Sequence, residues 1–171
     1  MKPLYEDIVP IIVTYNPDEK TLIASIDALL EQVKTIVIVD NGSIKAVGTI
    51  LQQLRPTQSD ALCLLALHQN FGLGKAYNAG IAIARKLHAA FVLLMDQDSI
   101  PEPTMLQELR RVHASLFHQG KQVAAVGASY RNQTHQGLAP FTRLTPFGLA
   151  KIHCEENTDF VATDFLISSG S

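Results

Sequence analysis

The chain has 171 residues, of which 47% are hydrophobic and 18% charged, and its formal net charge is −2. This balance is ordinary for one globular domain with a good core, and it lacks the basic footprint of a nucleic-acid-binding protein. No apolar stretch is long enough to span a bilayer, and no leader pattern precedes the first apolar run. The two cysteines show no metal-ligand spacing and indicate a reducing compartment. The expected location is therefore the cytoplasm, either free or at the inner face of the membrane.

Strand patterns and helix patterns alternate along the chain. The predicted strands are short apolar runs bounded by turn-forming residues, and they cover residues 8–14, 35–39, 61–67, 91–95 and 123–126, with a further strand-like run at 161–167. Between them, apolar residues recur with helical spacing, over residues 17–33, 45–54, 74–88 and 103–118. Residues 130–157 follow neither period, which favours a long loop or a hairpin.

The start of the first helix carries a capping signal. Asn16 is expected to be the N-cap, Pro17 suits the first helical position, and Glu19 completes the spacing of a capping box. The alternating order of elements then predicts an α/β fold with a mostly parallel sheet and helices on both faces.

An acidic pair, Asp96 and Asp98, follows the fourth predicted strand directly. Ligands of open α/β sheets bind at the carboxyl ends of the strands, and two carboxylates there suit a hard divalent cation that carries phosphate oxygens. The alternative interpretation is that Asp98 or Ser99 only caps the next helix, whose start is marked by Pro101 and Pro103. The motif alone leaves both interpretations open.

Polar residues recur at the end of each of the first four predicted strands. In a parallel sheet these ends meet at one edge, so the segments are expected to form a polar crevice for a nucleotide. They are Thr14-Tyr15-Asn16, Asp40-Asn41-Gly42-Ser43, Asn70-Phe71-Gly72 and Asp96-Gln97-Asp98.

Two common phosphate-binding fingerprints are absent from the sequence. The dinucleotide motif needs a third glycine where this chain has Tyr77, and no glycine follows the first strand. A P-loop needs a glycine where Gln69 stands and a hydroxyl residue where Ala76 stands. The crevice is therefore expected to bind its nucleotide in another way.

The ordered set of strand-end motifs resembles the inverting family 2 glycosyltransferases, whose fold is of the GT-A type. Within that family it looks most like the bacterial rhamnosyltransferases, which use dTDP-L-rhamnose to build surface polysaccharide. The resemblance runs in the right order over nearly the whole chain. It rests on the four segments above, on Lys75-Ala76-Tyr77-Asn78-Ala79-Gly80, and on the closing residues 164–171.

The resemblance implies a role for each strand-end segment. Thr14 and Tyr15 would line the base pocket, and Asp40 would contact the base or ribose. The ribose and diphosphate would lie against a set that combines polar side chains with close backbone approach at glycine, namely Asn70, Gly72, Gly74 and Asn78.

The acidic pair would form the metal part of this donor site. By resemblance, Asp98 binds Mg²⁺ or Mn²⁺ directly, while Asp96 reaches the ribose or the metal through water. The metal would neutralise the departing diphosphate. The expected partners are the nucleotide-sugar donor and a saccharide or lipid-linked saccharide acceptor, with no nucleic acid.

The family pattern continues past the residues at which this chain ends. Transfer with inversion needs a general base for the acceptor hydroxyl, and no matching motif precedes Ser171, so the catalytic base is unknown and expected beyond Ser171. We therefore expect a single GT-A-like domain over residues 1–171, with the nucleotide-sugar-binding half at 1–120 and a truncated acceptor half at 121–171. The fragment itself is expected to be inactive, with an exposed apolar edge or a dimer contact near residues 161–167.

Two alternatives remain at this stage. The chain could be a non-catalytic nucleotide-sugar-binding module or remnant. A nucleotidyltransferase would also use an acidic pair, but it would need a Gly-rich basic loop after the first strand, where Thr14-Tyr15-Asn16-Pro17 stands.

Overall fold

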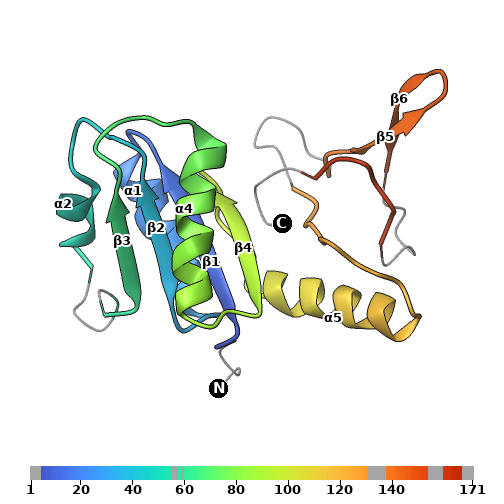
Figure 1. Cartoon of the computed structure of the whole chain (residues 1–171), viewed down its shortest axis with the longest axis horizontal. Coiled ribbons are helices and arrows are strands. Elements are labelled where there is room, and N and C mark those ends of the chain that lie inside the picture. The colour runs from blue at the N-terminus through green and yellow to red at the C-terminus, as the bar shows by residue number, and fades with distance from the viewer. Residues whose placement is uncertain (1–4, 55–57, 59, 131–137, 154–159, 167–171) are drawn as a thin grey trace. The chain divides into compact units, whose positions relative to one another are not determined.

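The computed structural model describes residues 5–54, 58, 60–130, 138–153 and 160–166. The chain forms two compact units, one within Met1–Pro103 and the other within Thr104–Ser169, and each is described by itself (Figure 1). The boundary between these units falls between Pro103 and Thr104. The division of a single domain near residue 120 stays a prediction.

A four-stranded parallel sheet forms the centre of the first unit (Figure 1). The spatial order of its strands is β3-β2-β1-β4. Their bounds are β1 Ile8–Thr14, β2 Ile36–Asp40, β3 Leu62–Ala66 and β4 Phe91–Asp96. The α/β fold with a mostly parallel sheet, consistent with the GT-A type, is thus confirmed.

Helices cover both faces of this sheet. The helices of the first unit are α1 Glu19–Leu30, α2 Val47–Leu51 and α4 Leu73–Lys86. Helix α4 contacts β1, β2 and β4, while α1 contacts β2 and lies on the opposite side of the sheet (Figure 1). Every residue of β1 and β2 is buried, which explains why these strands read as continuous apolar runs rather than alternating ones.

Successive side chains of a strand point to opposite faces, and the core divides accordingly. On the α4 face, alternate residues of β1 and β2 pack with three residues of the helix; this cluster includes Val9, Ile11, Val13, Val37, Val39, Ala76, Tyr77 and Ala84. On the other face Ile12, Ile36 and Ile38 are fully buried. Gly80 lets α4 approach closely, because a Cβ there would lie 2.4 Å from Cγ2 of Ile11.

The predicted cap of the first helix is wrong. Helix α1 begins at Glu19 with Asp18 as its N-cap, and the Asp18 Oδ2 atom accepts the Thr21 N–H at 2.9 Å. Asn16 instead has a φ of 49°, a left-handed conformation that asparagine tolerates better than most residues, and its side chain bonds to a different loop. Asp18 has the same short acceptor side chain and stands closer to the helix.

The second unit contains α5 Met105–His118 and an antiparallel hairpin of β5 Phe141–Thr145 and β6 Gly148–Ile152. The expectation of a hairpin within residues 130–157 is therefore met. Helix α5 starts from Thr104, which makes no side-chain cap bond, so neither Asp98 nor Ser99 caps it and the capping interpretation of the acidic segment is wrong.

Two predicted strands of the second unit are not found. Residues 123–126 form no ladder with any described strand, and Ala124 and Ala125 are exposed, so nothing packs on the run from both sides as a buried strand requires. Of the strand-like run at 161–167, the described part makes a single bridge, from Phe165 to Thr142. The side chains of Thr163 and Asp164 also bond to the β5 backbone. Ile167 lies outside the described residues.

Candidate functional site

The polar strand ends meet at one edge of the parallel sheet, as the sequence predicts. The registers place Thr14 beside Asp40, Asp40 beside Ala66, and Val13 beside Asp96. The loops after β1, β2, β3 and β4 therefore leave the sheet at the same level. They are joined to one another by hydrogen bonds that involve their side chains.

Asp40 and Thr14 are buried at this edge of the sheet. Asp40 is only 6% exposed and its Oδ1 accepts the Ser43 N–H at 3.0 Å. The Thr14 side chain is fully buried and its hydroxyl donates to the Val39 carbonyl at 3.4 Å. The hydroxyl of Thr14 thus lies beneath the surface, while the Asp40 carboxylate is held by one oxygen at the end of its strand.

The loop after β1 is fastened to the acidic segment by one side chain. The Tyr15 N–H donates to Oε1 of Gln97 at 2.7 Å, and Nε2 of Gln97 donates to the Tyr15 carbonyl at 3.3 Å. The Tyr15 side chain itself is 46% exposed. An exposed aromatic ring on a fixed backbone provides a flat surface on which a ring of a ligand can stack.

The same β1 loop is also joined to the loop after β2. The Asn16 N–H donates to the Ser43 hydroxyl oxygen, and the Ile44 N–H donates to Oδ1 of Asn16, both at 2.9 Å. The side chain of Asn16 therefore satisfies the backbone of another loop, and this explains why it is not available as a helix cap.

Asn41 joins the loop after β2 to the loop after β3. It is 4% exposed; its Nδ2 donates to Oδ1 of Asn70 at 3.1 Å, and its Oδ1 accepts the Phe71 N–H at 3.0 Å. Oδ1 of Asn70 also accepts the Gly72 N–H at 2.9 Å. These bonds fix the path of the chain as it enters α4.

Gly42 is required where the same two loops pass each other. Its φ is 87°, and a Cβ at this position would lie 2.5 Å from the carbonyl carbon of Gln69. No other type of amino acid tolerates both a positive φ and so close an approach of a neighbouring backbone. The Asn-Gly pair at 41–42 is thus more than a turn, because it sets the distance between the loops after β2 and β3.

The first turn of α4 is open, in the sense that no neighbouring atoms crowd its glycines. Its N-cap, Gly72, has a φ of 83° and makes no side-chain cap bond, and no atom lies within 4 Å of a Cβ built on Gly72 or Gly74. The N–H groups at a helix start carry a partial positive charge and favour anions. Asn78 is exposed on the same helix. Lys75 extends over the ring of Phe71, with Nζ 3.7 Å from the centroid, so its charge stays close to this turn.

The acidic pair ends β4 at the same edge. Asp96 is half-buried, and the Tyr77 hydroxyl lies 3.1 Å from the Met95 carbonyl and 3.4 Å from Oδ1 of Asp96. Asp98 is exposed. Within the described residues, no group of three or more His, Cys, Asp and Glu side chains could hold a metal ion. Two carboxylates fit Mg²⁺, which commonly takes one or two protein carboxylates and completes its shell with water and substrate phosphate.

Comparison with known proteins decides which family has this site. The family model named "Glycosyl transferase family 2" matches residues 11–165. The chain belongs to glycosyl transferase family 2. It is also 28% identical over 166 residues to the dTDP-rhamnosyl transferase RfbF of Shigella flexneri, a match that covers 96% of this chain and 53% of RfbF. The chain thus spans about half the length of the curated relative it matches.

Membership of family 2 confirms the resemblance to that family seen in the sequence, and the likeness to RfbF is a likeness to a dTDP-rhamnosyl transferase. The matched residues include all of the donor-site positions named above, from Thr14 to Asp98. Among the described residues of this family 2 chain, no helix is long and apolar enough to cross a membrane.

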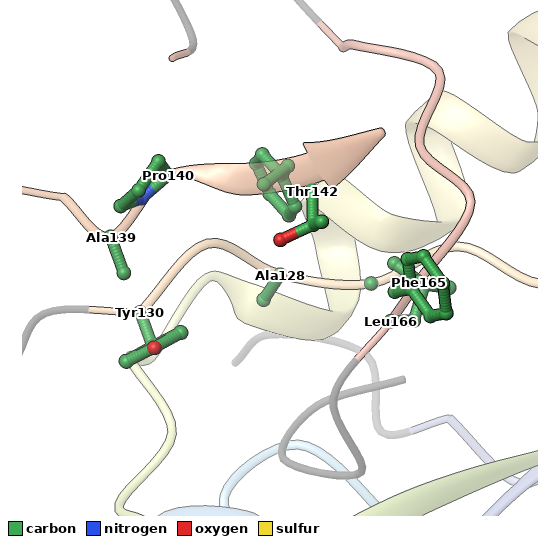
Figure 2. Close-up of a pocket in the computed structure, with 9 residues that line it drawn as sticks. Ala128, Tyr130, Ala139, Pro140, Thr142, Phe165 and Leu166 are labelled. Atoms are coloured by element: carbon green, nitrogen blue, oxygen red, sulfur yellow. The ribbon is translucent and has the colours of Figure 1, made fainter. Parts of the chain in front are cut away.

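The second unit of the family 2 chain contains a separate cavity of about 120 Å³. Three segments line it, at residues 127–130, 139–142 and 165–166 (Figure 2). Its lining is mainly apolar, with Tyr130, Phe141 and Phe165 as the aromatic members. None of the predicted donor-site residues belongs to this cavity.

Sequence reasoning missed the residues that hold the donor-site loops together. Asn41 and Gln97 lie inside the strand-end segments, but the sequence alone assigns neither of them a role. A signal was available for Gln97, since a long amide between two carboxylates at a strand end is able to bond to a neighbouring strand's backbone. No local signal existed for Tyr77, whose partners are reached only once α4 packs on the sheet.

Proposed function

We propose that this chain provides the nucleotide-sugar donor site of a glycosyltransferase that transfers L-rhamnose from dTDP-rhamnose to a cell-surface saccharide acceptor with inversion. The single observation that supports it best is that the loops at the strand ends are hydrogen-bonded to one another at one edge of the sheet. These loops place buried Asp40, exposed Tyr15, the first turn of α4 and the acidic pair at the same edge. The rhamnosyl donor is suggested by the likeness to RfbF, whose name specifies dTDP-rhamnose chemistry.

The nucleoside would bind at the loops after β1 and β2. The Ser43 N–H occupies Oδ1 of Asp40, and we assign Oδ2 of the same carboxylate to an N–H of the base or a ribose hydroxyl. The exposed Tyr15 ring supplies a stacking surface on the same loop edge. Thr14, whose side chain is buried, contributes through the backbone that places Tyr15.

The diphosphate would bind at the start of α4. The open backbone at Gly72 and Gly74 allows a phosphate to approach the N–H groups of the first turn. Asn70 already uses Oδ1 to shape this turn, which leaves its Nδ2 to donate to a phosphate or ribose oxygen. Asn78, exposed one turn further along, extends the polar surface.

Asp98, with Asp96 beside it, would hold Mg²⁺ or Mn²⁺. When bound there, the metal would offset the negative charge that develops on the leaving diphosphate. The chain's own contribution is to place the two carboxylates at the end of β4: Asp96 ends the strand and faces the Tyr77 hydroxyl, and Asp98 lies two residues further on, exposed to solvent. The general base for the acceptor hydroxyl is not assigned to any residue of this chain.

A calorimetric screen tests the donor class. We expect the protein to bind dTDP and dTDP-rhamnose more tightly than UDP- or GDP-sugars, and to bind them more tightly with Mn²⁺ than with EDTA. Equal and weak binding of all nucleotides in both buffers would contradict the proposal. Binding without transfer is the result we expect of this chain, because no general base for the acceptor hydroxyl is assigned to any of its residues.

Two variants test the assigned groups. Asp98→Asn should remove most of the gain in dTDP affinity that Mn²⁺ gives, and the matched control Asp60→Asn, an exposed aspartate before β3, should not. Asp40→Asn keeps an oxygen for the Ser43 N–H but loses the charge, so thymidine and dTDP should both bind roughly 10- to 100-fold more weakly, as for a lost charged hydrogen bond. An unchanged thymidine affinity would remove Asp40 from the nucleoside site.

A further inference from the structure

Gln97 makes a pair of hydrogen bonds that continues the sheet beyond its last backbone pairing. The ladder between β1 and β4 ends with Val13 beside Asp96. Past that point, the Gln97 carboxamide accepts from the Tyr15 N–H at 2.7 Å and donates to the Tyr15 carbonyl at 3.3 Å. A side-chain amide thus takes the place of a partner strand, and it satisfies both backbone groups of one residue.

The two neighbours of Gln97 are restrained very differently. Asp96 is half-buried and faces the Tyr77 hydroxyl. Asp98 is exposed, and its side chain has no hydrogen bond or ion pair with any residue that the structure describes. The position of the Asp98 carboxylate therefore depends on the backbone of the turn, which the Gln97 side chain joins to the loop after β1.

We propose that Gln97 is a positioning residue that holds Asp98 at a fixed place relative to Tyr15. The nucleoside and metal parts of the donor site would then keep a constant distance from each other. The inference rests on the proposed function, because it assigns Tyr15 to the nucleoside and Asp98 to the metal. Pre-organisation of this kind improves affinity by lowering the ordering that a ligand must impose. It acts only on a ligand that engages both ends at once, which here means a nucleoside diphosphate with its metal.

Two substitutions separate the tether from the size of the side chain. Gln97→Met has a similar length and cannot make either bond. Gln97→Glu keeps an oxygen for the shorter bond, from the Tyr15 N–H. It sets its second oxygen against the Tyr15 carbonyl in place of the longer bond, and it adds a negative charge between Asp96 and Asp98. Gln107→Ala, at an exposed position on α5, is the control for a glutamine outside the first unit.

Amide hydrogen exchange of Tyr15, followed by NMR without any ligand, tests the tether itself. We expect the fastest exchange in Gln97→Met, intermediate exchange in Gln97→Glu, which keeps one of the two bonds, and no change in Gln107→Ala. Wild-type protection of the Tyr15 amide in Gln97→Met would overturn the inference at once, because the tether would then not exist in solution.

Calorimetry tests the coupling. For each protein we would titrate thymidine without metal, and dTDP with Mn²⁺ and with EDTA. In Gln97→Met, the dTDP affinity in Mn²⁺ should fall roughly tenfold, the scale of one or two lost hydrogen bonds, while thymidine affinity changes less than about twofold. Gln97→Glu keeps the shorter bond and adds a carboxylate beside the metal site, so its Mn²⁺ gain should be no smaller than that of the wild type.

The outcomes distinguish this inference from the proposed function. If the wild-type protein binds no nucleotide, the proposed function fails and the inference fails with it. If the wild type binds dTDP with a Mn²⁺ gain and Gln97→Met keeps that gain, only the inference fails. An equal loss for thymidine and for dTDP in both buffers would show that Gln97 merely stabilises the fold, and this too would overturn the positioning role.

Discussion

The two units bury their strands in different ways. In the first unit every residue of β1 and β2 is buried, between helices on both faces of the sheet. In the second unit the β5–β6 hairpin leaves Leu144, Phe147 and Leu149 exposed by 64%, 100% and 68%. Burial on both faces fixes the register of a strand, since a slip by one residue would move every side chain to the wrong face. A hairpin that is open on one side has no such constraint.

This difference explains where the candidate site lies. All the predicted donor-site residues belong to the first unit, at the ends of strands whose positions are fixed by the core. Fixed strand ends allow side-chain amides such as those of Asn41 and Gln97 to join neighbouring loops with good geometry. The second unit offers a small apolar cavity, an exposed hairpin and the bonds of Thr163 and Asp164 to the β5 backbone, and it contains none of the predicted donor-site residues.

The largest expected effect on stability distinguishes a buried strand residue of the first unit from an exposed hairpin residue of the second. Ile38→Ala, at a position with no exposure in β2, should lower the free energy of unfolding by about 2–5 kcal/mol, because it leaves a cavity between sheet and helix. Leu149→Ala removes a side chain of similar size from the exposed face of the hairpin and should cost less than about 0.5 kcal/mol. Urea denaturation followed by circular dichroism measures both. Equal losses would show that the hairpin face is covered in solution.

A smaller effect is expected from the contact between α4 and the sheet. A Cβ on Gly80 would lie 2.4 Å from Cγ2 of Ile11 and 3.2 Å from Cγ2 of Val39, so Gly80→Ala should destabilise the protein by about 1–3 kcal/mol through overpacking. Gly74→Ala, in the same helix, meets no atom within 4 Å and should be neutral or stabilising by up to about 1 kcal/mol. Thermal unfolding compares the two, and the reverse order would mean that α4 packs differently on the sheet.

The comparison of the units also shows what the sequence could predict. The four strands of the parallel sheet were predicted within a residue or so, because continuous apolar runs have few other uses in a small α/β chain. The meeting of Thr14, Asp40 and Asp96 at one edge followed from parallel topology alone. The strand predicted at residues 123–126 is wrong because a short apolar run specifies burial only if another element covers it.

The partners of the site residues could not be predicted in the same way. Gln97 bonds to a residue 82 positions away, and Asn41 to one 30 positions away, so the sequence near either side chain does not show which residue it bonds. Asn16 was given the capping role that Asp18 fulfils, since both side chains are short acceptors and only the folded loop shows that Asn16 bonds to the Ile44 N–H. Roles that depend on packed loops become visible only with the fold.

The smallest expected effect concerns the start of α1. The Thr21 backbone N–H and then its hydroxyl donate to the Asp18 carboxylate, and these bonds hold the pKa of Asp18 below its ordinary value of 3.8. Because the folded-state pKa is the lower one, the cap contributes its full stability above about pH 3.8 and loses it as the pH falls through the folded-state pKa.

Two variants of Asp18 test whether the stability that the cap contributes is lost as the pH falls. Asp18→Ala removes the cap and should lower Tm by a few degrees at pH 7, with a difference from wild type that narrows as the pH falls below 3.8. Asp18→Asn still accepts from the Thr21 N–H but does not titrate, so it should be close to wild type at pH 7 and become the more stable of the two in acid. Other carboxylates, including Glu19, titrate in all three proteins and largely cancel in these differences. A gap between wild type and Asp18→Asn that is independent of pH would mean that the Asp18 carboxylate is not the cap of α1 in solution.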